Sequence, residues 1–85
     1  MNLLFIHLGA NVLVPLKDVI AIIDAKMEES TESMREFLHT ADEEGFVVTI
    51  DQDEIKSYVV TTKNVYYSPI SSLTLKKRSH FIGNL

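Results

Sequence analysis

The chain contains no cysteine, and for a domain of 85 residues this limits how the fold can be stabilised. A domain this small buries only a modest share of its surface. Such chains are commonly reinforced by a disulfide, a metal or a partner subunit. The lack of cysteine excludes a disulfide and a thiolate zinc site. Because apolar residues make up 46% of the sequence, we expect a single domain over residues 1–85 whose apolar surface partly faces another copy, as a homo-oligomer.

Charge is unevenly distributed along the chain, whose net charge is −4. Residues 1–27 are balanced, residues 28–54 carry ten acids and one base, and residues 55–85 carry five bases and no acid. This separation allows one face to meet phosphate although the whole chain is acidic. It equally allows acidic and basic faces of neighbouring subunits to meet. A solvated surface of uneven charge is the third interpretation.

Two features argue for a cytoplasmic location without membrane association. No run approaches the roughly 20 apolar residues that span a bilayer. The apolar run over residues 3–8 is short, and no basic residue precedes it, so a signal peptide is not expected.

Short apolar runs predict three strands in the first third of the chain. Residues 3–8 precede the turn signal Gly9-Ala10-Asn11, residues 12–14 end at Pro15, and residues 19–23 are rich in β-branched side chains. Proline lacks the N–H that a strand ladder needs, so the second strand should end there.

The hydrophobic period changes over residues 31–44, which predict an amphipathic helix. Apolar residues recur at the helical spacing i, i+3, i+4 and i+7, at Met34, Phe37, Leu38 and Ala41. Ser30 or Thr31 can cap its start, and Gly45 fits the position after its end.

Strand patterns return over residues 46–50, 58–62 and 65–67, with a polar connection at 51–54 and a tight hairpin at Lys63-Asn64. Ser71 can cap a short C-terminal helix, with Ile70 and Leu75 as a hydrophobic staple. The bases at 76–78 would then lie in its last turn, where positive charge is favoured. The whole pattern predicts an α+β fold: a small, mainly antiparallel β domain with one amphipathic helix and a short C-terminal helix.

The sequence offers little for catalysis, and we expect no enzyme, no cofactor and no metal. The serines occupy cap and turn positions, and no serine-centred elbow motif occurs. The histidines, His7, His39 and His80, have no partners at metal-ligand spacing. The acidic pair Asp53-Glu54 lies in a polar loop, where nothing apolar would raise a pKa as acid catalysis requires.

Lys76, Lys77 and Arg78 form the most distinctive charged cluster. Contacts from Lys and Arg to phosphate supply most of non-specific nucleic-acid affinity. Capping of a helix C-terminus explains the same residues without a ligand. The absence of acids from residue 55 onward favours a surface that faces a ligand or a partner.

Two segments together resemble a known family. Phe5-Ile6-His7-Leu8-Gly9, followed by residues 17–22, and the closing run over residues 59–78 resemble the RemA/RemB family of bacterial extracellular-matrix (biofilm) regulators, in its RemB-like branch. The resemblance implies regulation of matrix genes. The RemA branch consists of DNA-binding transcription activators with a LytTR-like fold that assemble into rings. The resemblance therefore implies a LytTR-like fold, a homo-oligomer that can form a ring, and duplex DNA as a partner.

One departure from the family pattern bears on DNA binding. Where the RemA branch carries a paired arginine, this chain has Asp53-Glu54, and carboxylates repel phosphate. DNA binding is therefore not carried over residue by residue. Either another face binds DNA, or the chain contacts a protein partner among the matrix regulators. The candidate DNA-binding residues are Lys17, Lys56, Lys76, Lys77 and Arg78.

Overall fold

The computed structural model describes residues 4–28 and 31–83 and confirms the α+β class. Six strands and three α-helices follow one another with one 3₁₀ turn, η1. In chain order the elements are β1 (Phe5–His7), β2 (Leu13–Pro15), η1 (Leu16–Asp18), β3 (Val19–Asp24), α1 (Ala25–Glu28), α2 (Glu32–Glu43), β4 (Val47–Thr49), β5 (Ser57–Thr61), β6 (Val65–Ser68) and α3 (Ser72–Gly83).

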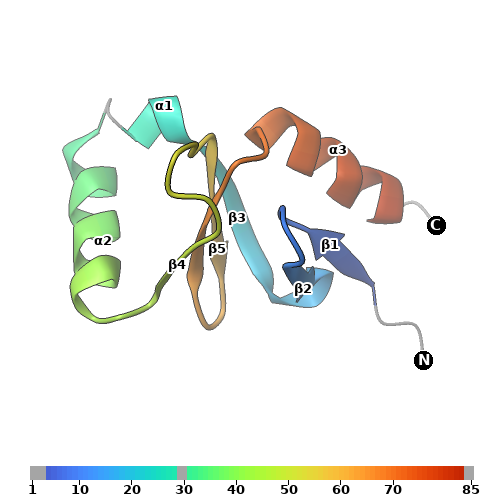
Figure 1. Ribbon diagram of the computed structural model, residues 1–85, viewed down its shortest axis with the longest axis horizontal. Coiled ribbons are helices and arrows are strands. Elements are labelled where there is room, and N and C mark those ends of the chain that lie inside the picture. The colour runs from blue at the N-terminus through green and yellow to red at the C-terminus, as the bar shows by residue number, and fades with distance from the viewer. Residues whose placement is uncertain (1–3, 29–30, 84–85) are drawn as a thin grey trace.

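The strands form two sheets with different roles. Four of them form a sheet in the order β3-β5-β6-β4, in which only the β4–β6 pair is parallel. β1 and β2 form a separate antiparallel hairpin. In Figure 1, α2 lies at one end of the molecule, the four-stranded sheet lies in the middle, and the hairpin and α3 lie at the other end.

The sheet separates two apolar cores. On one side, Val59 of β5 packs with Ile6, Leu8 and Val14 of the hairpin segment and with Leu75 of α3. On the other side, the α2 residues Leu38 and Ala41 pack on Val65 of β6, with the partly buried Tyr58 and Val60 of β5 beside them. Since side chains alternate along a strand, β5 contributes to both cores.

Buried polar contacts tie the hairpin to the sheet. The Ser68 hydroxyl is fully buried, donates to the Leu8 carbonyl at 2.6 Å and accepts from the Ile70 N–H at 3.0 Å. Gly9 follows Leu8 in the chain and has a φ of +116°, a backbone conformation that residues with an L side chain rarely adopt. A Cβ there would lie 3.0 Å from Pro69 Cγ, so this approach of the two chain segments requires glycine.

The predicted ends of α2 and the predicted start of α3 are confirmed. The Thr31 side chain caps α2 by accepting from the Met34 N–H at 3.3 Å, and Gly45 lies just past its end at a φ of +81°. Ser30, the alternative cap, lies outside the described residues, as does Leu3 of the first predicted strand. Ser71 caps α3 by accepting from the Thr74 N–H at 3.2 Å.

The predicted length of the C-terminal helix is wrong. α3 extends to Gly83, so Lys76–Arg78 lie in its middle and not in its last turn. No glycine or proline occurs between Ser72 and Gly83, which leaves the helix without an earlier stop. The predicted hairpin is confirmed, since β5 and β6 pair antiparallel on either side of residues 62–64. The Thr61 hydroxyl holds this turn, because it accepts from the Asn64 N–H and donates to the Asn64 carbonyl.

Replacing Ser68 by alanine should destabilise the fold. Ser68→Ala leaves the buried Leu8 carbonyl and Ile70 N–H without their partner, a loss of about 1–3 kcal/mol in the free energy of unfolding. Urea denaturation followed by circular dichroism measures it. The matched control is Ser79→Ala, which removes an exposed hydroxyl bound to the Lys76 carbonyl and should cost less than about 0.5 kcal/mol. Equal losses for the two variants would contradict this role of Ser68.

Candidate functional site

The strongest candidate surface is the exposed middle of α3. Lys76 and Lys77 are both exposed. Within residues 4–28 and 31–83 neither forms an ion pair. Arg78 differs from them, because it is partly buried and its Nη1 donates to the His7 carbonyl at 2.9 Å. Two lysines are therefore available to an anionic partner, while Arg78 also holds α3 against β1.

The other two candidate lysines lie at opposite ends of the β3–β5 pair. Lys17 lies in η1, next to the end where Val19 pairs with Thr61. Lys56 precedes Ser57, which pairs with Asp24 at the far end of the ladder. At about 3.3 Å per residue, the length of β3 separates them. The structure thus brings Lys76, Lys77 and Arg78 together but does not bring Lys17 to Lys56.

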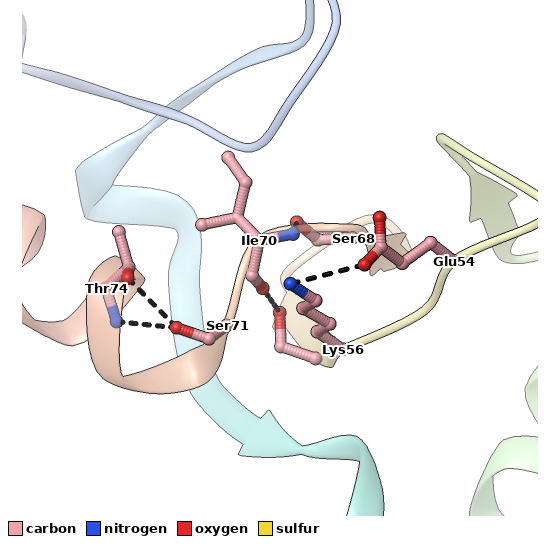
Figure 2. Close-up of polar contacts among 7 residues, drawn as sticks. Glu54, Lys56, Ser68, Ile70, Ser71 and Thr74 are labelled. Atoms are coloured by element: carbon pink, nitrogen blue, oxygen red, sulfur yellow. Dashed lines mark hydrogen bonds and ion pairs between the residues drawn. The ribbon is translucent and has the colours of Figure 1, made fainter.

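Lys56 is partly neutralised by Glu54 in the loop before β5. Its Nζ lies 3.2 Å from Glu54 Oε1, and both side chains are about half exposed (Figure 2). An exposed pair of this kind contributes little to stability and exchanges readily with other ions. The backbone of Lys56 is fixed, since its N–H donates to the Ser68 carbonyl at 2.8 Å and its carbonyl accepts from the Ala25 N–H at 3.0 Å.

A pocket of about 280 Å³ adjoins Lys56 at the start of α3. Figure 2 shows Lys56 and Glu54 on one side of this region and the turn of Ile70 and Ser71 on the other. The Ser57 hydroxyl donates to the Ile70 carbonyl at 2.7 Å, which fixes the helix start against β5. Sequence reasoning missed this pocket, because the segments that line it are distant in the chain. They are residues 24–26, 55–56 and 71–72.

Exposed apolar side chains gather on two opposite sides of the molecule. Next to α2, Ile20, Phe37 and Phe46 are exposed at the edge of an apolar groove of about 420 Å³. On the outer face of the hairpin, Phe5 and Leu13 are exposed. Ile20 is 66% and Leu13 is 61% exposed, so neither contributes much to the core of its own chain.

The histidines and acids are arranged as surface groups. His7 Nε2 donates to the Ala10 carbonyl at 2.6 Å, and His39 contacts Glu43 one helical turn away. The side chain of His80 lies outside the part that is described. Among the residues described, no three His, Asp or Glu side chains gather as metal ligands would. No helix in the same part of the chain has the length and apolar character to cross a membrane.

Comparison with known proteins gives two agreeing matches. The model of a family described as RemA-like, extracellular matrix regulatory protein A-like, matches residues 5–79. Extracellular matrix regulatory protein B of Bacillus subtilis (strain 168) is 42% identical over 79 residues, which cover 93% of this chain and 94% of that protein. The matched region contains the hairpin, the sheet and the bases of α3.

Removal of Arg78 should affect stability more than removal of its neighbour. Arg78→Ala loses the bond to the His7 carbonyl, which should lower the free energy of unfolding by about 0.5–1.5 kcal/mol. Lys77→Ala removes an exposed charge and should change it by less than about 0.5 kcal/mol. Thermal unfolding of both variants tests this. If Lys77→Ala were the more destabilising of the two, Arg78 would not be the residue that anchors α3 to β1.

Proposed function

The chain belongs to the RemA-like family of extracellular matrix regulatory proteins, and from this we propose that it regulates matrix genes as a homo-oligomer that binds duplex DNA. The proposed action is non-enzymatic and takes place in the cytoplasm, as transcription regulation for biofilm formation. The observation that carries the proposal is the pair Lys76 and Lys77, exposed and free of ion pairs in the described structure.

The charge distribution in space supports α3 as the DNA-facing element. α2 and the turn after it carry the acids Glu32, Glu36, Asp42, Glu43 and Glu44. α3 carries three bases and no acid. Because the sheet lies between the two helices (Figure 1), a polyanion can approach α3 while the acidic helix faces away.

The two apolar surfaces support assembly from head to tail. The groove bordered by Ile20 lies on the α2 side of the sheet, and the outer face of the hairpin, with Leu13, lies on the other side. A contact between two different surfaces is heterologous, and repeated contacts close into a ring if the rotation allows it.

Assembly would also explain how a basic site that is weak in each subunit can still bind DNA. Two lysines per subunit give only modest affinity for phosphate. When one subunit is bound, linked copies bind at a high effective concentration, so several weak sites on one assembly reinforce one another.

The Glu54–Lys56 contact favours a second candidate function. In this function the chain contacts another matrix regulator and does not bind DNA. The loop that carries the paired arginine in the RemA branch is acidic in this chain, and its nearest base, Lys56, already faces Glu54. A protein partner with a basic surface would suit this loop and α2.

Loss of the two α3 lysines should weaken binding to duplex DNA. We expect Lys76→Gln/Lys77→Gln to lower affinity and to reduce the slope of log affinity against log salt by about 1 for each lysine that contacts phosphate. Fluorescence anisotropy over a salt series measures both. The matched control, Lys17→Gln/Lys63→Gln, removes the same charge outside α3. An equal or larger effect of the control would place the DNA contact elsewhere.

Mixing two variants tests the head-to-tail contact. Ile20→Gln should damage the groove and Leu13→Gln the hairpin face, so each variant alone should sediment as a smaller species than the native chain. Mixed, they retain one intact contact between them and should form a heterodimer. Leu73→Gln, at an exposed leucine of α3, is the control and should assemble normally. If only Ile20→Gln affected the mass, the contact would be symmetric and not heterologous.

A further inference from the structure

We propose that the pocket at the start of α3 is a binding site for a terminal phosphate group, as carried by inorganic phosphate or a small phosphate monoester. The pocket of about 280 Å³ is lined by Lys26 and Lys56, by the first residues of α3, and by Asp24, Ala25 and Ile55. The proposal does not depend on the DNA binding proposed above, and Lys76 of α3 lies one helical turn after the pocket residue Ser72.

The start of α3 supplies donors to this pocket. The first N–H groups of a helix have no acceptor within the helix, and the helix dipole makes its N-terminus favourable for anions. The Ser71 side chain occupies only the Thr74 N–H. The N–H groups of Ser72 and Leu73 precede Thr74, so they are the donors from which a bound oxyanion would accept hydrogen bonds.

Ser72 provides a second and independent indication of a ligand. Its side chain lines the pocket, and the residue is only 8% exposed. Within the described residues no hydrogen bond engages its hydroxyl, and no buried side-chain oxygen there lacks a partner, so the Ser72 Oγ atom is open to the pocket. A hydroxyl that faces a pocket and is not used by the fold is available to donate to an oxyanion. The Ser57 and Ser68 hydroxyls nearby, by contrast, are both satisfied within the fold.

Two lysines and two carboxylates set the charge at the pocket. Asp24 is engaged, because its Oδ1 accepts from the Lys26 N–H at 2.9 Å at the start of α1. Glu54 contacts Lys56 at the rim. A phosphate monoester carries about −1.5 to −2 charges near neutral pH, so it competes well with the single charge of Glu54 for the Lys56 ammonium. Glu54 therefore acts as a built-in competitor for the site.

The recessed position of Ser72 selects the ligand class. A phosphate in a DNA backbone is a diester with only two free oxygens, and it is held between two sugars on a convex surface. It cannot easily reach a residue that is 8% exposed. A terminal phosphate has three free oxygens and can satisfy a hydroxyl, helix N–H groups and an ammonium together.

Titration with inorganic phosphate, followed by the amide resonances of the full chain, tests the proposal. At constant ionic strength, Ser72 and Leu73 amides should shift in a saturable manner. Ser72→Ala and Lys56→Gln should each weaken binding about three- to tenfold, and Glu54→Gln should strengthen it. Because Lys56 is exposed, Lys56→Gln preserves the fold even if Ser72→Ala does not.

The control variant is Lys63→Gln, in the β5–β6 turn, which should leave phosphate affinity unchanged. A nucleoside monophosphate should shift the same amides as inorganic phosphate, whereas a duplex should not shift them. Absence of saturable shifts at Ser72 and Leu73 in the native chain and in Glu54→Gln would overturn the proposal. Equal affinity of Lys56→Gln and the native chain would also overturn it. A duplex that shifts these amides and is displaced by phosphate would overturn the assignment to a terminal phosphate.

Discussion

Strand β5 must bury both of its faces, and the rest of the structure depends on this. Val59 belongs to the core under the hairpin and α3, and Val60 packs in the core under α2. A shift of one residue in register would exchange the two faces. Buried hydroxyls at both ends of the strand oppose such a shift, because Ser57 donates to the Ile70 carbonyl and Thr61 to the Asn64 carbonyl.

The two-sided sheet also keeps opposite charges apart. The acidic helix α2 packs on one face and the basic helix α3 on the other, so a chain with a net charge of −4 still presents a basic end. The same arrangement places one exposed apolar surface at each end. In our proposal, the two apolar surfaces meet between neighbouring copies while the exposed α3 lysines contact DNA, and one layered fold supports both roles.

Local sequence signals predicted much of this fold, and tertiary contacts account for the remainder. The strand runs, the α2 period, Gly45, and the caps at Thr31 and Ser71 are local features, and the structure confirms them. The parallel pairing of β4 with β6 and the short helix α1 had no distinct local signal. The length of α3 was misjudged, because the basic cluster was interpreted as the end of a helix.

The candidate site was predictable only in part, because local sequence signals do not show which distant residues meet in the fold. The cluster over residues 76–78 is contiguous in sequence and was identified there. Arg78 reaches a carbonyl 71 residues away, and no sequence pattern indicates that contact. The separation of Lys17 from Lys56 follows from the β3–β5 register. The pocket at Ser72 combines three distant segments, so it became visible only in the folded chain.

The central claim is that several copies of this chain bind DNA together through their basic ends. Sedimentation of the protein with a fluorescent duplex at low and at physiological salt tests it most directly. The account predicts a complex whose mass requires several protomers for each duplex, and which dissociates as salt rises. An assembled protein that leaves the duplex free even at low salt would contradict it and would favour the protein-interaction function.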